Sequence, residues 1–210
     1  MEILFNSPRL YRAKFFFTGA LTSIVKPICF RNHFRFREIL AERIRPGETV
    51  CEIGCGDGEN YRFLLADVGN ISFTGLDLNP HMIEHCRARH PEARWVCCNL
   101  AEVAETQRFD ACVVCNVLHH LNSRKDALTV LQTATRISRR LLLCEPLQSD
   151  IWPLPLLKRL YWTLTDGGNF YMRLEEFHAI FAEAHVTVDW EMASEPLHHF
   201  YVCQLSRMQD

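Results

Sequence analysis

The 210-residue sequence lacks a strong net charge, a long apolar run and any repeated or low-complexity segment. A formal net charge of -2 provides no overall field that attracts polyanions, so we expect no nucleic-acid partner. The most apolar run, residues 15–25, is too short to span a bilayer, and no small-residue cleavage site follows it. No group of residues has convincing metal-ligand spacing, so no metal is expected. These absences favour one cytoplasmic domain with a substantial core.

Cysteine is plentiful, with ten residues, but its placement does not suggest a disulfide framework. Most cysteines fall in apolar, strand-like runs, where a thiol behaves as a small hydrophobe, and a reduced chain is the simpler interpretation. Cys112 and Cys115 have the spacing of a metal knuckle, but residues three apart on a strand point to opposite faces. We therefore expect buried thiols without a metal.

The N-terminal part of the chain is basic and aromatic. Residues 1–47 contain nine Arg and Lys side chains against three Glu side chains. The pattern predicts that residues 1–32 form a helical segment that packs on the domain. A lid over the active site, or contact with an anionic membrane surface, is the alternative function for this segment.

From residue 33 onwards, short apolar runs alternate with amphipathic stretches. This alternation predicts an α/β fold with a Rossmann-like, seven-stranded sheet, mostly parallel with an antiparallel C-terminal hairpin, and with helices on both faces. Residues 33–210 then form a single domain, and an aromatic stretch at about 146–171 breaks the alternation as an insertion over the pocket. Strands are predicted at residues 49–53, 71–78, 93–98, 109–117, 141–145, 185–192 and 198–205, and helices at 34–44, 61–68, 80–90, 126–137 and 174–184.

The first predicted strand ends in a glycine turn, G-C-G-D-G at residues 54–58. Glycines at alternate positions let the backbone turn sharply and approach a ligand closely. A dinucleotide fingerprint would need a third glycine where Glu59 stands, and a phosphate-binding loop would need a Gly-Lys-Ser/Thr that is missing. The turn is flanked by Glu52, contains Asp57 and holds no cation. It therefore suits a cationic ligand with free hydroxyls better than a pyrophosphate.

Residues 50–58, V-C-E-I-G-C-G-D-G, are similar to the glycine-rich first motif of class I S-adenosylmethionine-dependent methyltransferases. The resemblance continues through Asp77 at the end of the second strand, the segment at 109–121 and the C-terminal hairpin, so that it covers about residues 30–205. It implies S-adenosylmethionine as the cofactor, with Asp77 accepting both ribose hydroxyls. One departure is Asn99, where many relatives have aspartate. By position, the implied cofactor-binding residues are Glu52, Gly54, Cys55, Gly56, Gly58, Asp77, Leu78, Met82, Asn99, Leu100 and Asn116.

The resemblance also places candidate catalytic residues beside the expected methyl position. Methyl transfer requires a base only when the acceptor carries a proton, and an imidazole is suited to that role near neutral pH. His119 and His120 follow the fourth strand, and we predict that His120 faces the pocket with Glu145 as its partner or as an alternative base. Glu145 could instead bind backbone N–H groups near a helix start.

The aromatic insertion argues for an apolar or aromatic small molecule as the acceptor, with oxygen the favoured methylated atom. The alternative is a domain that retains the cofactor pocket but does not transfer methyl, and that catalyses a rearrangement or serves as a scaffolding subunit. The sequence does not indicate the oligomeric state.

Overall fold

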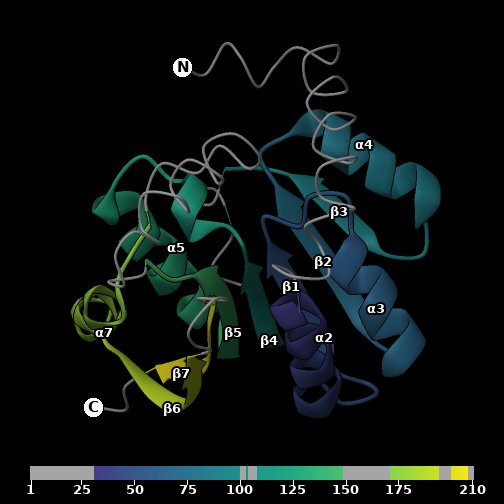
Figure 1. Cartoon of the computed structure of the whole chain (residues 1–210). Helices are drawn as coiled ribbons and strands as arrows, with labels where there is room; N and C mark the ends of the chain where they lie inside the picture. Colours follow the sequence, from purple (N-terminus) through teal and green to yellow (C-terminus); the bar gives the residue numbers. More distant parts are fainter. Residues whose placement is uncertain (1–30, 100–102, 104–107, 149–170, 194–199, 208–210) are drawn as a thin grey trace.

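Strands and helices alternate along most of the chain in the computed structural model, which describes residues 31–99, 103, 108–148, 171–193 and 200–207 (Figure 1). The helices are α2 (Arg31–Arg43), α3 (Glu59–Asp67), α4 (Pro80–Arg89), the short 3-10 helix η3 (Leu118–His120), α5 (Arg124–Ile137) and α7 (Leu174–Glu183). The strands are β1 (Thr49–Ile53), β2 (Ser72–Asp77), β3 (Arg94–Cys97), β4 (Phe109–Cys115), β5 (Ser138–Pro146), β6 (Val186–Ala193) and β7 (Phe200–Arg207).

The seven strands form one sheet in the order β3-β2-β1-β4-β5-β7-β6. The first five strands along the chain run parallel, whereas β7 pairs antiparallel with both β5 and β6. The predicted sheet, mostly parallel with an antiparallel C-terminal hairpin, is thus confirmed. The strand order reverses between β1 and β4, and in such sheets the crevice at the carboxyl ends of these two strands is where ligands bind.

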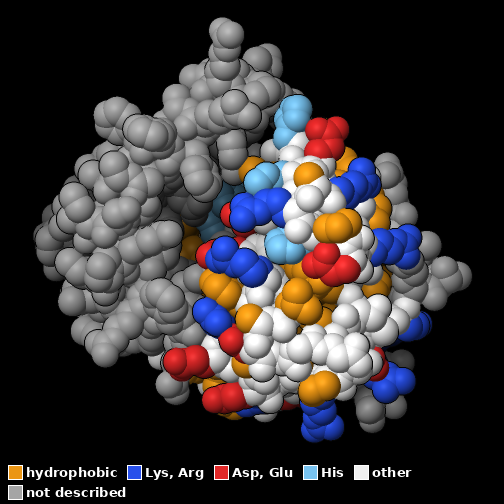
Figure 2. Space-filling view, turned by 90° about the vertical axis from the view of Figure 1, so that its right-hand side faces the viewer, with side chains coloured by type: hydrophobic (Ala, Val, Ile, Leu, Met, Phe, Trp, Pro, Cys, Tyr) orange, Lys and Arg blue, Asp and Glu red, His pale blue; other side chains and the backbone are white. Residues whose placement is uncertain are grey.

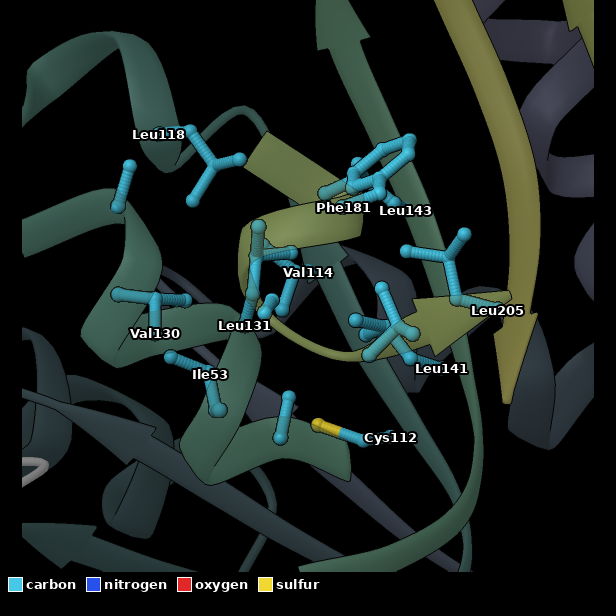
Figure 3. Close-up of a cluster of buried hydrophobic side chains, with 14 of the residues drawn as sticks. Ile53, Cys112, Val114, Leu118, Val130, Leu131, Leu141, Leu143, Phe181 and Leu205 are labelled. Carbon is cyan, nitrogen blue, oxygen red and sulfur yellow. The ribbon is translucent and has the colours of Figure 1, made fainter. Parts of the chain in front are cut away.

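Helices cover both faces of the sheet, with α2, α3 and α4 on one side and α5 and α7 on the other (Figure 1). Figure 3 shows the core on the second side, where Val114 of β4 and Leu143 of β5 pack with Leu131 of α5. Neighbouring residues of β4 alternate between the faces. Cys112 lies in this core and Cys115 in the opposite one, which confirms that the two thiols diverge.

Seven of the nine cysteines in the described ranges are buried, as expected for thiols that serve as core residues. Cys97 is the exception, because β3 is the edge strand and leaves this side chain exposed, while Cys98 beside it is partly covered. The expectation of burial was therefore wrong for Cys97.

Several predicted features lie outside the described residues. These are nearly all of the N-terminal segment (residues 1–32), most of the predicted insertion (146–171), and Leu100. Within the described ranges, none of the helices has the length and apolarity that crossing a membrane requires.

Gly75 in β2 is required by the packing of the edge strand. It pairs with Trp95 of β3, and a Cβ at this position would lie 2.4 Å from the Trp95 ring and 2.9 Å from the sulfur of Cys55. Trp95 is only 4% exposed, and its indole N–H donates to the His90 carbonyl at 2.8 Å, so the ring has little room to move. Gly75→Ala is expected to lower the free energy of unfolding by about 2 kcal/mol or more, measured in urea.

Gly69→Ala is the control for this substitution. Its φ of +84° disfavours a side chain, but no atom lies within 4 Å of the added Cβ. The strain alone costs about 1 kcal/mol. If the two variants lost the same stability, the packing argument for Gly75 would be wrong.

Candidate functional site

The glycine turn after β1 lies at the carboxyl edge of the sheet and is fixed to the neighbouring strand. The N–H groups of Gly54 and Cys55 both donate to the Leu76 carbonyl of β2, at 2.8 and 3.1 Å. Gly54 has a φ of +72°, and a Cβ there would lie 2.5 Å from the Val117 side chain. Gly56 has a φ of +52° and faces open space. Gly54 therefore brings the turn close to the end of β4, while Gly56 leaves the backbone accessible to a ligand.

Asp77, the last residue of β2, is bound to this turn. Its Oδ2 accepts from the Gly56 N–H at 2.9 Å, and its Oδ1 accepts from the Asn79 N–H at 2.8 Å. Each carboxylate oxygen can accept a further hydrogen bond, so two hydroxyl donors can still be bound. Asn79 caps α4 by accepting from the His81 N–H at 3.0 Å. Asn79 therefore caps α4, and the Asp77 side chain is directed at the glycine turn.

Glu52 is a buried carboxyl next to the turn, with only 2% of its surface exposed. Its Oε1 accepts from the side-chain amide of Asn60 at 2.6 Å, but its Oε2 has no hydrogen-bond partner among the described residues. Burial, together with the negative charges of Asp57, Asp77 and Glu59, raises the pKa of Glu52 to about 8. Within the described ranges, this carboxyl group therefore has no positively charged partner.

The other predicted cofactor residues surround the same edge. Leu78, directly after Asp77, is 69% exposed, which is unusual for a large apolar side chain. Met82 on α4 is half-buried, and Asn99 after β3 is exposed. Asn116 follows β4 with a φ of +57° and donates its N–H to the Cys144 carbonyl at 2.9 Å. An exposed leucine beside an acidic strand end suits the planar face of a nucleoside.

Glu145 lies at the end of β5 and is fully buried. Its Oε1 accepts from the N–H groups of Val117 and Leu118 at 2.6 and 2.8 Å, at the start of η3. Its Oε2 lies 2.8 Å from Nδ1 of His119. Glu145 therefore binds backbone N–H groups near a helix start and also pairs with a histidine, so it has both of the contacts considered in the sequence analysis.

The histidine that pairs with Glu145 is His119 and not His120, contrary to our expectation. His119 is 2% exposed, whereas His120 is exposed. The centroids of the two imidazole rings lie 4.2 Å apart. The Tyr171 ring stacks on His119, with the two ring centroids 5.5 Å apart. The physical reason is the 3-10 geometry of η3, which turns consecutive side chains in different directions.

Two residues of the site were missed in the sequence. Asn60 is not among the predicted site residues, although a polar side chain eight positions after Glu52 was the available signal. Tyr171 lies at the far end of the aromatic stretch, and no local pattern distinguished it from the other aromatic residues there.

Comparisons with known proteins agree with this geometry. Residues 50–140 match the family described as a methyltransferase domain. The curated tRNA (carboxymethyluridine(34)-5-O)-methyltransferase alkbh8 of Xenopus tropicalis is 30% identical over 94 residues, which is 45% of this chain and 14% of that protein. The chain thus spans only a small part of this relative.

Solved structures show the same fold at low identity. The mitomycin 7-O-methyltransferase MmcR superposes with a TM-score of 0.73 at 16% identity, over 99% of this chain and 60% of that one. The magnesium protoporphyrin IX methyltransferase ChlM of Synechocystis PCC 6803, solved with bound S-adenosylhomocysteine, gives 0.64 at 17% identity, over 84% and 81%. Residues 50–140, which include the glycine turn and Asp77, thus match a methyltransferase domain, and the solved structures that share the fold include a methyltransferase with bound S-adenosylhomocysteine.

Proposed function

We propose that this chain transfers a methyl group from S-adenosylmethionine to an apolar or aromatic small molecule, with an oxygen atom as the favoured acceptor. The observation that carries the proposal is the proximity of a cofactor-type turn to a buried His–Glu pair. Val117 links them, because its side chain lies against Gly54 while its N–H donates to Glu145. A ligand on the turn would therefore present its reactive end to the region of His119.

The residues around the turn fit the chemistry of the cofactor. Asp77 offers a carboxylate to the ribose hydroxyls, the exposed Leu78 offers an apolar face to the adenine, and Glu52 offers an unpartnered buried oxygen to a cationic group. Gly56, facing open space, lets the methionine moiety approach the backbone. When bound, the cofactor supplies an electrophilic methyl group on a positively charged sulfur, so the protein mainly has to align the acceptor and exclude water.

His119 is the stronger candidate for a base, because Glu145 fixes its orientation. Nδ1 lies 2.8 Å from the carboxylate, so the imidazole is held in one orientation and can serve as a base toward an acceptor hydroxyl. His120 stays a candidate as the exposed member of the pair. The two ends of the predicted insertion also meet here, since Leu147 and Met172 form a β-bridge next to β5. We propose that the segment between them covers the acceptor.

Glu145→Gln is expected to lower the free energy of unfolding by about 2–3 kcal/mol, because a neutral amide replaces a carboxylate with several charge-assisted bonds. The measurement is urea unfolding at neutral pH. His120→Ala is the control, since removal of this exposed ring should lower the free energy of unfolding by no more than about 0.5 kcal/mol. Glu145 would lose its assigned role if both variants were equally stable.

Labelled methyl incorporation tests the proposed function. Purified protein is incubated with radiolabelled S-adenosylmethionine and, separately, with phenolic, polyketide-like and fatty acceptors and with unmodified tRNA. We expect incorporation into a hydroxyl-bearing small molecule, and expect His119→Ala to reduce it by about 100-fold. Cofactor binding without transfer to any acceptor would favour the alternative of a rearranging or scaffolding domain.

A tRNA acceptor is the second candidate, because tRNA methyltransferases are among the relatives. The surface over α3 and α4 argues against it. Figure 2 shows Arg and His side chains on that face intermixed with carboxylates. Two ion pairs belong to these elements: Arg62 lies 3.5 Å from Glu59 in α3, and His90, which follows α4, lies 3.5 Å from Glu92. Such a face lacks the single-signed charge that a nucleic acid requires. Methyl incorporation into tRNA alone would reverse this preference.

A further inference from the structure

The Oε2 oxygen of Glu52 has no hydrogen-bond partner in the part of the chain that the structure describes, so its burial does not stabilise the folded protein. The side chain is almost completely buried between β1 and α3, and Asn60 satisfies only Oε1. A buried polar atom without a partner costs about 1–3 kcal/mol, and considerably more if it is charged. A carboxyl in this setting is therefore expected to stay protonated until a positively charged group binds beside it.

The electrostatic surroundings of Glu52 act in the same direction. The charges that act on it most strongly are those of Asp57 in the turn, Glu59 at the start of α3 and Asp77 at the end of β2, and all three are negative. The titratable thiols around it lie in the turn, α4 and β4, and add no positive charge: Cys55, Cys86, Cys112 and Cys115.

We propose that binding of the cofactor is coupled to the release of one proton from Glu52, whose carboxylate then becomes the buried counter-charge of the ligand's ammonium group. The O–H bond of the carboxyl breaks, its proton leaves to solvent, and the ammonium donates to the oxygen that lacked a partner. This inference rests on the proposed function and adds to it a mechanism of ligand selection. The ammonium group is preferred to the sulfonium because only the ammonium carries N–H donors for Oε2.

The coupling has a chemical consequence for ligand choice. S-adenosylmethionine and S-adenosylhomocysteine both carry the ammonium. By contrast, 5′-methylthioadenosine has the same nucleoside and, like S-adenosylhomocysteine, a thioether, but it has no amino-acid moiety. Only the first two can draw the proton from Glu52. The pocket therefore recognises the amino-acid end of the ligand through ionisation of a protein group.

Isothermal titration calorimetry at about pH 6.5 tests the proposal, because Glu52 is then protonated and the ligand amine, with an ordinary pKa near 7.7, is charged. Titrations in several buffers that differ in ionisation enthalpy give the number of protons exchanged. We expect S-adenosylhomocysteine to release close to one proton and 5′-methylthioadenosine to release close to none.

Glu52→Gln is the matched variant, since an amide keeps the shape of the side chain and its acceptor for Asn60. We expect it to abolish proton release, to weaken S-adenosylhomocysteine by about 10- to 100-fold, and to leave 5′-methylthioadenosine within about twofold. If the wild-type protein bound S-adenosylhomocysteine without proton release, the coupling would be refuted while the proposed function stood. If it bound neither ligand, the cofactor assignment itself would fail.

Discussion

Asp77→Ala is expected to weaken the binding of S-adenosylhomocysteine by about 100-fold or more. The substitution removes the acceptor proposed for two ribose hydroxyls, and a hydrogen bond to a charged group contributes about 1.5–3 kcal/mol. It also frees the Gly56 and Asn79 N–H groups that the carboxylate holds at 2.9 and 2.8 Å. Both effects act at the edge of the sheet where we propose that the ligand binds. Isothermal titration at constant pH and salt measures the affinity.

Two variants separate ribose recognition from support of the turn. Asp77→Asn keeps one side-chain oxygen as an acceptor and should lose less affinity than Asp77→Ala. Asp189→Ala removes a carboxylate that bonds to Ser206 on the far strand pair, and should leave affinity unchanged. Near-normal affinity of Asp77→Ala would show that the ribose lies elsewhere.

Glu52→Gln is expected to make the ligand-free protein more stable than the wild type, and increasingly so as the pH rises from 5 to 8. The unfolded chain loses the Glu52 proton near its ordinary value of 4.5, but the folded chain keeps it until about pH 8. The folded state therefore loses stability relative to the unfolded state throughout this window, by about 1.4 kcal/mol per pH unit. Over three units the advantage of the glutamine variant reaches about 4 kcal/mol.

Urea unfolding of both proteins without ligand, at about pH 5, 6.5 and 8, gives the comparison. The difference in unfolding free energy should be small at the lowest pH and largest at the highest. Parallel pH profiles would mean that Glu52 titrates as an ordinary surface carboxyl. The predicted gain in stability accompanies a loss of ligand affinity, which is the pattern expected when a group is kept for binding at a cost to folding.

Much of the fold was predictable because it depends on local patterns. Apolar runs bounded by turn residues gave all seven strands, and the glycine turn indicated the edge where we propose that the ligand binds. The residues 54–58 and Asp77 follow their strands directly in the chain, so parallel strands necessarily bring them together. No knowledge of packing was needed for this part of the site.

The pairing of His119 with Glu145 could not be predicted, because it depends on strand register and on one backbone conformation. Cys115 of β4 lies opposite Cys144 of β5, which places Glu145 level with the first residue after β4. Asn116 then takes a φ of +57°, and the backbone N–H groups of the next two residues reach the carboxylate. The left-handed conformation of Asn116 and the 3-10 turn that follows it together determine which histidine pairs with Glu145. Neither register nor that φ value is visible in the pattern of apolar residues.

The position of β7 between β5 and β6 has a consequence for how the chain folds. β6 precedes β7 along the chain but contacts the sheet only through it, so β6 has no place in the sheet until residues 200–207 have been inserted. Tyr201 of β7 is also in register with Glu145 of β5. Formation of these contacts between residues distant in sequence is slow compared with local helix formation. During synthesis on the ribosome, the end of the sheet formed by β7 and β6 would therefore be among the last parts of the described fold to acquire its final structure.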